Sequence, residues 1–289
     1  MKESAEQIAI IDSAWELAGR YDLWLCDVWG VIHNGRAAFG DAVSACAAFR
    51  ATGGTVILLT NAPRPSESVR GQLDALGVDR AGYDAIVSSG DVTRHLIEAL
   101  GGRPAFHLGP ERDVPIFAEL AVNLTGAESA EVVINTGLYD DTTETPDDYR
   151  DLLAGFRARD LDMICANPDI RVERGSDLVY CAGALARAYQ AIGGTVVYAG
   201  KPYLPIYDLA MERAGALRGE PLARGRALAI GDGLATDILG AANAGIDALF
   251  VRSGVHVAGE RALDSGILGE LFADTTHRLP VAAIDTLVW

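Results

Sequence analysis

One stretch near the start of the chain restricts the fold more than any other, residues 23–35, LWLCDVWGVIHNG. A run of large apolar side chains there ends in a single carboxylate, Asp27, and Gly30 and Gly35 then allow the chain to turn. This pattern predicts a buried strand that ends in a loop carrying an acid. Ligands of open α/β sheets lie outside the carboxyl ends of the strands. Asp27 is therefore a candidate functional residue, although such a carboxylate can also cap a turn or be a solvated charge.

Similar short apolar runs alternate with stretches of helical spacing along the chain. They lie at residues 55–60 (TVILLT), 85–87, 195–202 (TVVYAGKP), 226–233 (RALAIGDG) and 247–254 (DALFVRSG). Strands that alternate with helices indicate an α/β fold with a parallel sheet and crossover helices. The first 22 residues have a helical apolar spacing and predict an opening helix, whereas the tail from residue 257 is expected to cover a sheet edge.

The alternation changes from about residue 101, where the polar loops between apolar runs become longer. We therefore expect residues 90–193 to form an inserted second α/β domain, and residues 1–89 and 194–289 to form the first domain together. The length of 289 residues also fits two domains, because a typical domain has roughly 100–200 residues.

Composition restricts the location and the partners. The net charge of −16 argues against a nucleic acid polymer or an anionic membrane as partner. It does not argue against a phosphate ester, because one bound divalent cation can reverse the local charge. Four cysteines without CxxC spacing predict reduced, buried thiols and a cytoplasmic protein. The sequence has no run of 18 uninterrupted apolar residues, so we expect no membrane span.

Four of the loops that follow predicted strands supply side chains suited to phosphate chemistry. Asp27 could attack phosphorus as a carboxylate nucleophile. Thr60, at the head of the next helix, could bind a phosphate oxygen, and Lys201 could neutralise the transferring group. Asp232 and Asp27 offer the hard oxygen ligands that Mg²⁺ prefers. Each residue alone has a structural alternative as a cap or turn, but the four together in this order favour a functional site.

The order of these motifs resembles the haloacid dehalogenase (HAD) superfamily, the phosphatases and phosphotransferases that form an aspartyl phosphate. The matching motifs are DVWGV from Asp27, LLTN around Thr60, GKP around Lys201, and GDGLATD at residues 231–237. The insert between the second and third motifs contains CANPD at residues 165–169 and CAGALARAY at residues 181–189. These features look like the class IIA, NagD-like branch, which carries an α/β cap, and the resemblance covers nearly the whole chain.

The resemblance implies a Rossmann-like core with an inserted cap, and Mg²⁺-dependent hydrolysis of a small phosphomonoester, of sugar phosphate or nucleotide type, through a phosphorylated Asp27. By motif match, Lys201 would bridge the nucleophile and the phosphate, and Asp237 would orient Lys201 or a metal-bound water. The residues implied to contact phosphate or substrate are Gly30, Thr60 and Asn61. The implied metal ligands are Asp27, Asp232 and the backbone carbonyl of Trp29.

Residue 29 is where the chain departs from the family pattern, which has a second Asp there as general acid and base. Trp29 cannot take this role, because its indole N–H is only a donor. Such assistance is typically worth 10²–10⁴-fold in rate, or roughly 3–5.5 kcal/mol of barrier. His33 is the nearest replacement in sequence, with an ordinary pKa near 6.5, and its alternative is a turn histidine. Trp29 itself could instead be a platform for a substrate ring.

Three functions remain open from the sequence. The protein could be a phosphatase in which His33, a cap residue or the substrate supplies the proton. It could hydrolyse activated phosphates whose leaving groups need no proton. It could also be a phosphoester-binding or regulatory protein with little or no turnover. The four matching motif residues favour a hydrolase. In the cap, Asn167, Asp169 and Arg171 are candidate substrate contacts, although residues 167–169 could equally form a turn. A homodimer through the cap is a further expectation.

Overall fold

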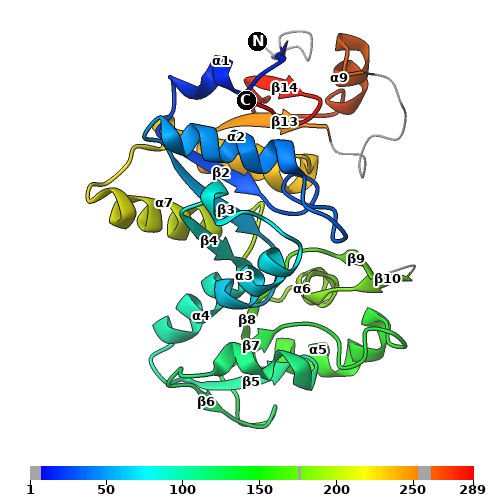
Figure 1. Cartoon of the computed structure of the whole chain (residues 1–289). Helices are drawn as coiled ribbons and strands as arrows, with labels where there is room; N and C mark the ends of the chain where they lie inside the picture. The colour runs from blue at the N-terminus through cyan, green and yellow to red at the C-terminus, as the bar shows by residue number, and fades with distance from the viewer. Residues whose placement is uncertain (1–7, 175–176, 253–261) are drawn as a thin grey trace. The chain divides into compact units, whose positions relative to one another are not determined.

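The computed structural model describes residues 8–174, 177–252 and 262–289, and the chain divides into two compact units (Figure 1). The first unit comprises residues 1–60, 69–87 and 201–289, and the inserted unit comprises residues 61–68 and 88–200. The short segment 61–68, directly after the second predicted strand, therefore belongs to the inserted unit, whereas the residues before and after it belong to the first unit.

The first unit is built on a sheet that has seven strands among the described residues. Their order is β1 (Ala9–Ile10), β14 (Ala282–Ile284), β13 (Asp247–Val251), β12 (Ala227–Gly231), β2 (Leu23–Asp27), β3 (Thr55–Thr60) and β4 (Ala85–Ser88). The pairs from β1 through β3 are parallel. Strand β2 lies between β12 and β3 and is buried along its whole length, as its apolar composition predicts.

Helices connect and cover these strands. They are α1 (Trp15–Ala18), α2 (Gly40–Ala51), α3 (Ser66–Ala75), α7 (Leu204–Arg218), α8 (Leu239–Ala244) and α9 (Ser265–Leu271). In Figure 1, α2 crosses in front of the sheet, and its Phe49 stacks on Trp24 of β2 with ring centroids 4.1 Å apart. Helices α7 and α8 lie so close that a Cβ on Gly240 would be 2.4 Å from the hydroxyl of Tyr207.

The inserted unit has its own parallel sheet of five strands within the described residues. The order is β11 (Val196–Tyr198), β8 (Asp162–Cys165), β7 (Val132–Asn135), β5 (Pro104–Leu108) and β6 (Asn123–Leu124). One apolar cluster joins this sheet to α5 (Arg150–Ala158) and α6 (Ala182–Ala191), and another joins it to α4 (Ser89–Ala99) and the 3-10 segment Glu111–Phe117. An antiparallel hairpin, β9 (Arg171–Arg174) and β10 (Asp177–Tyr180), follows β8.

The α/β class predicted from the sequence is confirmed, with one parallel sheet in each unit. Three expectations for individual segments were wrong. Residues 195–202 do not return to the first sheet, because β11 pairs with β8 of the inserted sheet. The described part of residues 1–22 forms strand β1 and the single-turn helix α1 in place of one opening helix. The tail supplies an inner strand, β14, between β13 and β1, whereas its residues 257–261 lie outside the described part.

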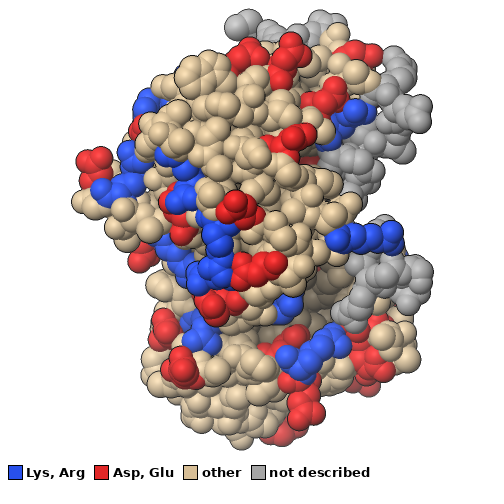
Figure 2. All heavy atoms as spheres, viewed as in Figure 1, with Lys and Arg blue, Asp and Glu red and all other residues tan. Residues whose placement is uncertain are grey.

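Charged side chains of both signs are interspersed on the face shown in Figure 2. Several form ion pairs on the surface, such as Arg80 with Asp74 and Arg150 with Asp147. In the described ranges, none of the helices is long and apolar enough to cross a membrane.

The contact between Phe49 and Trp24 gives the first prediction. Phe49→Ala would leave a cavity against the buried Trp24 ring and should lower the free energy of unfolding by about 3–5 kcal/mol, measured by urea denaturation. Leu217→Ala is the control, because Leu217 on α7 is 53% exposed and its truncation should change stability by about 0.5 kcal/mol or less. Equal losses for the two variants would contradict the packing described here.

Candidate active site

Asp27 lies at the carboxyl end of the central strand β2, and the register of the sheet brings two other strand ends beside it. Asp27 pairs with Leu59, so that Thr60 is the next residue along β3. Its neighbour Cys26 pairs with Ile230 of β12, which places Gly231 and then Asp232 at the same edge. The parallel sheet thus gathers residues that are more than 200 positions apart in the sequence.

Lys201 joins this edge from the segment before α7 and forms ion pairs with two carboxylates. Its Nζ lies 2.5 Å from Oδ1 of Asp27 and 2.7 Å from Oδ1 of Asp237, and 3.5 Å from the carbonyl oxygen of Leu59. The side chain of Lys201 is only 5% exposed. Lys201 is therefore held in one position between the end of β2 and the segment after β12.

The second oxygen of Asp237 is bound by the turn that precedes it. Oδ2 accepts hydrogen bonds from the backbone N–H of Gly233 at 3.1 Å and from Oγ1 of Thr236 at 3.2 Å. Gly231 also allows this carboxyl group to lie close, because a Cβ there would be 2.2 Å from Cγ of Asp237. Asp237 is thus fixed at both oxygens and in turn fixes Lys201.

Asp232 lies directly against the loop that follows Asp27. A Cβ on Gly30 would be 2.2 Å from Oδ2 of Asp232, and Gly30 has a φ of +90°. Only glycine tolerates both the left-handed backbone and this close approach. Gly30, predicted as a substrate contact, therefore has a structural role that the structure makes visible: it gives the Asp232 carboxylate its place beside the Asp27 loop.

The charges of this cluster shift the pKa values of its members. Burial and the negative charge of Asp237 raise the pKa of Asp27 well above its ordinary value, although Lys201 pairs with it. Burial alone would lower the pKa of Lys201, but the carboxylates of Asp237 and Asp27 outweigh it and hold that pKa well above its usual range. Lys201 is consequently charged at neutral pH, and the three neighbouring carboxyl groups of Asp27, Asp232 and Asp237 share this one cation.

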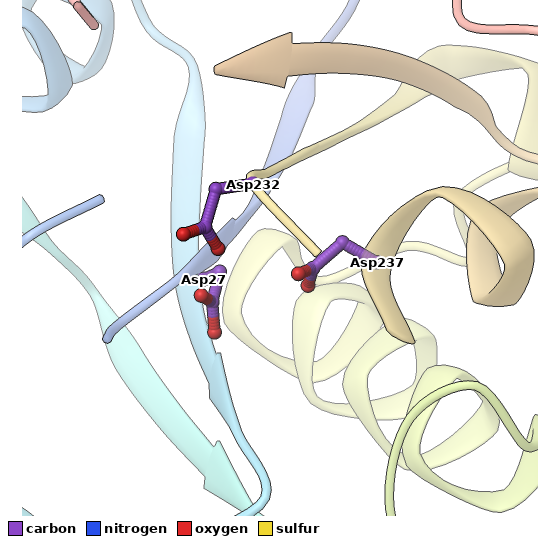
Figure 3. A group of neighbouring side chains, drawn as sticks. All are labelled: Asp27, Asp232 and Asp237. Carbon is purple, nitrogen blue, oxygen red and sulfur yellow. The ribbon is translucent and has the colours of Figure 1, made fainter. Parts of the chain in front are cut away.

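This donor set fits a divalent cation. Asp27, Asp232 and Asp237 are all buried and offer carboxylate oxygens that lie within 4.8 Å of one another (Figure 3). Because Asp237 uses its oxygens for Lys201, Gly233 and Thr236, the carboxylates of Asp27 and Asp232 are the better ligands. A cation would also offset the charge that raises the pKa of Asp27.

The loop after β2 packs around the Trp29 indole. A Cβ on Gly35 would be 2.4 Å from Cη2 of the indole, and the His33 ring meets the indole edge to face with centroids 5.5 Å apart. Trp29 is nevertheless 42% exposed. His33 is buried, and its Nδ1 accepts a hydrogen bond from the Gly35 N–H at 2.9 Å, which is the turn arrangement foreseen as the alternative for this residue.

Burial lowers the pKa of His33, so its neutral form predominates at neutral pH, with the proton on Nε2 because Nδ1 accepts. A neutral imidazole is a poor proton donor, which leaves His33 as a weak candidate for the general acid. The role predicted for His33 stays a prediction, with geometry that gives it no support.

The remaining predicted residues belong to the inserted unit, and three of them, Asn61, Asn167 and Asp169, contact one another. Nδ2 of Asn61 donates to Oδ1 of Asp169 at 2.9 Å. Oδ1 of Asn167 accepts from the backbone N–H of Asp169 at 3.0 Å, so residues 167–169 form the turn that was the alternative interpretation. The guanidinium of Arg171 lies over the Tyr180 ring, 4.2 Å from its centroid. Their substrate contacts stay predictions.

Tyr207 is a member of the site that sequence reasoning missed. It is fully buried on α7, and its hydroxyl lies 3.4 Å from the backbone carbonyl oxygen of Asp237, to which it donates. Burial and the charge of Asp237 raise the pKa of this phenol, so it stays protonated. An aromatic residue on the apolar face of a helix is indistinguishable from a core residue by its spacing alone.

Comparison with known proteins shows that the chain is similar to haloacid dehalogenase-like hydrolases in sequence and in structure. A family model described as haloacid dehalogenase-like hydrolase matches residues 24–123, and one described as HAD-hydrolase-like matches residues 198–275. A crystal structure of a hydrolase of the haloacid dehalogenase-like family from Brucella suis 1330 is 46% identical, with a TM-score of 0.82, and the match covers 96% of this chain and all of that one (100%).

Two curated relatives have named activities. D-glycerol 3-phosphate phosphatase of Mycobacterium tuberculosis is 30% identical over 251 residues, which are 84% of this chain and 66% of the relative, just under two thirds of its length. Ribonucleotide monophosphatase NagD of Escherichia coli K12 is 25% identical over 233 residues, which are 80% of this chain and 87% of the relative.

The close approach of Gly30 to Asp232 predicts a specific defect. Gly30→Ala should displace the carboxylate of Asp232 and weaken binding of Mg²⁺ by about tenfold or more, measured by isothermal titration. Gly53→Ala is a matched control, because Gly53 has a similar φ of +94° but no atom within 4 Å of its would-be Cβ. It should lose about 1–2 kcal/mol of stability and keep its cation affinity. Unchanged Mg²⁺ binding in Gly30→Ala would refute the role of this contact.

Proposed function

Because the chain belongs to the haloacid dehalogenase superfamily, in its NagD-like branch, we propose that it is a phosphatase that hydrolyses small phosphomonoesters through a phosphorylated Asp27. The observation that carries this proposal is the Lys201 ammonium, which bridges Asp27 and Asp237 beside the Asp232 carboxylate. A solely structural role would not need buried groups of this charge at one sheet edge.

The proposed reaction has two steps on Asp27. A carboxylate oxygen of Asp27 attacks phosphorus, the bond from phosphorus to the ester oxygen breaks, and the leaving alcohol takes up a proton. Water then attacks the phosphorus of the acyl phosphate, which releases inorganic phosphate and a proton and restores the Asp27 carboxylate. Lys201 holds Asp27 in place through Oδ1 and offsets the negative charge that develops on the transferring group.

We assign the metal site to Asp27, Asp232 and the backbone carbonyl of Trp29, with Mg²⁺ as the cation. When bound, Mg²⁺ supplies positive charge that favours ionised Asp27 and stabilises the phosphoryl oxygens. Asp237 keeps Lys201 oriented, since its other oxygen is held by Gly233 and Thr236. Thr60, at the end of β3, and Asn61 are the proposed ligands of the phosphoryl oxygens.

The substrates we propose are small phosphomonoesters of the sugar phosphate, polyol phosphate or nucleotide type. The names of the relatives support this class, since one acts on D-glycerol 3-phosphate and another on ribonucleotide monophosphates. In the inserted unit, Asn167 remains the proposed contact to the remainder of the substrate, and a homodimer through this unit remains a proposal.

Trp29 favours a second candidate, a phosphoester-binding or regulatory protein with little turnover. The indole cannot release a proton to an alkoxide, and His33 uses Nδ1 to accept from Gly35. An aryl phosphate needs no such proton, because its phenolate is a much better leaving group. The ratio of aryl to alkyl turnover therefore separates a phosphatase short of a proton donor from a protein that only binds its ester.

The nucleophile is tested with Asp27→Asn. The wild type should release phosphate from p-nitrophenyl phosphate and from a panel of sugar and nucleotide monophosphates only when Mg²⁺ is present, and Asp27→Asn should reduce this rate by about 10⁴-fold or more. Removal of Mg²⁺ with a chelator should have a similar effect. Metal-dependent turnover that survives in Asp27→Asn would rule out the aspartyl-phosphate route, and no wild-type turnover on any ester would favour the binding protein.

The role of Trp29 is tested with two substitutions at one position. Trp29→Asp should raise kcat on alkyl phosphates by at least about tenfold, because a carboxyl group can protonate the alkoxide, and should change the aryl rate much less. Trp29→Ala is the control for removing the ring, and should raise KM more than it changes kcat if the indole is a platform for substrate. If both variants leave kcat and KM unchanged, Trp29 has neither role.

A further inference from the structure

The side chain of Asn61 is fixed by the inserted unit, although its chain neighbour Thr60 belongs to the first unit. Asn61 is 9% exposed, and its Nδ2 donates to Oδ1 of Asp169 at 2.9 Å. The two residues are 108 positions apart. This contact connects the residue after Thr60 with the loop that follows strand β8.

The carbonyl end of the same amide is confined as well. A Cβ on Gly200 would lie 2.5 Å from Oδ1 of Asn61 and 2.8 Å from Oγ of Ser89. Only a residue without a side chain therefore lets the chain pass Asn61 directly before Lys201. The carboxamide is thus held by Asp169 at its nitrogen and has the Gly200 backbone close to its oxygen.

Asp169 is itself rigidly supported. Its N–H donates to Oδ1 of Asn167 at 3.0 Å, and the Sγ of Cys165 contacts the Asn167 carbonyl oxygen at 3.2 Å. Gly183 of α6 also lies close to this loop, because a Cβ on Gly183 would be 2.5 Å from the carbonyl oxygen of Asp169. Asp169 thus offers a fixed acceptor rather than a mobile surface charge.

The rest of segment 61–68 is bound to the start of α4 in the same unit. Gly90 N–H donates to the carbonyl oxygen of Ala62 at 3.1 Å, and Oγ of Ser88 donates to that of Arg64 at 2.6 Å. The N–H of Ser66 donates to Oδ1 of Asp91 at 2.9 Å. These bonds hold the backbone of the segment, and the bond from Nδ2 to Asp169 holds the side chain of Asn61.

We propose that Asp169 is a positioning residue, which holds the Asn61 carboxamide in the orientation in which it binds an oxygen of the phosphoryl group. This inference rests on the proposed function and assigns Asp169 a role through Asn61 in place of a direct contact with the substrate. Loss of a hydrogen bond that orients a buried polar group is typically large enough that phosphate binding or turnover should change about tenfold to hundredfold.

A double-mutant cycle tests this proposal. Asn61→Ala, Asp169→Ala and the double variant are compared for kcat/KM on p-nitrophenyl phosphate with Mg²⁺, and for affinity to inorganic phosphate by isothermal titration. Each single variant should lose about tenfold to hundredfold, and the double variant should be within about twofold of Asn61→Ala alone. Multiplying losses would overturn the proposal, because they would mean that Asp169 acts independently of Asn61.

Two further variants separate positioning from general damage to the inserted unit. Asp169→Asn keeps an oxygen acceptor and should retain activity within about threefold of the wild type. If Asp169 instead contacted the substrate through its negative charge, this substitution would lower the activity much more. Asp162→Ala, at the exposed start of the same strand β8, should leave both readouts unchanged. A loss in Asp169→Asn as large as in Asp169→Ala would overturn the proposal.

The phosphate affinity distinguishes failure of this inference from failure of the proposed function. If the wild type turns over no ester yet binds inorganic phosphate, the proposed activity fails, and the same non-additive pattern in affinity would still support the role of Asp169. If Asn61→Ala binds phosphate and turns over ester as the wild type does, Asn61 is not a phosphate ligand and the inference is overturned.

Discussion

The ammonium of Lys201, buried between the carboxylates of Asp27 and Asp237, is the interaction on which the arrangement of the site depends. Removing a charge from water is expensive unless opposite charges and hydrogen bonds replace the solvent, so this ion pair requires a firmly held frame. The turn at residues 233–237 supplies that frame by binding the second oxygen of Asp237. Because Asp27, Asp232 and Asp237 offer buried carboxylate oxygens close together with one ammonium among them, the cluster is suited to a divalent cation.

The parallel sheet brings the members of this cluster together at one edge. Strand β2 is central, and its neighbours β3 and β12 run parallel to it, so all three carboxyl ends open at one edge. Glycines then replace side chains where the acids approach the backbone, Gly30 beside Asp232 and Gly231 beside Asp237. The chain's lysine usage is consistent with a special position: of its 24 lysines and arginines, only Lys2 and Lys201 are lysines. A compact ammonium can contact two carboxylates where the planar fork of arginine would need more room.

Sequence patterns predicted the strands that carry the site, because each is a short apolar run ending in polar residues, and predicted that Asp27, Lys201, Asp232 and Asp237 are site residues. They did not predict which sheet the strand at residues 196–198 joins, since a buried apolar run pairs equally well in either parallel sheet. Strand β1 was predicted as part of a helix, because its two residues are too few to show the alternation of a strand. The bond from Asn61 to Asp169 crosses 108 positions and has no local signal, so only the fold reveals it.

Trp29 shows how a loop can be built around a residue that changes the chemistry beside it. Gly35 has a φ of +80° and leaves open the space in which the indole lies, while its N–H occupies Nδ1 of His33. The glycine that accommodates the indole therefore also donates to Nδ1 of His33, and burial lowers the pKa of this imidazole, which favours its neutral form. Under the proposed function, the loop as a whole, and not only the absence of a carboxylate at residue 29, limits proton donation from this side, so the leaving group of the ester decides how fast the reaction runs.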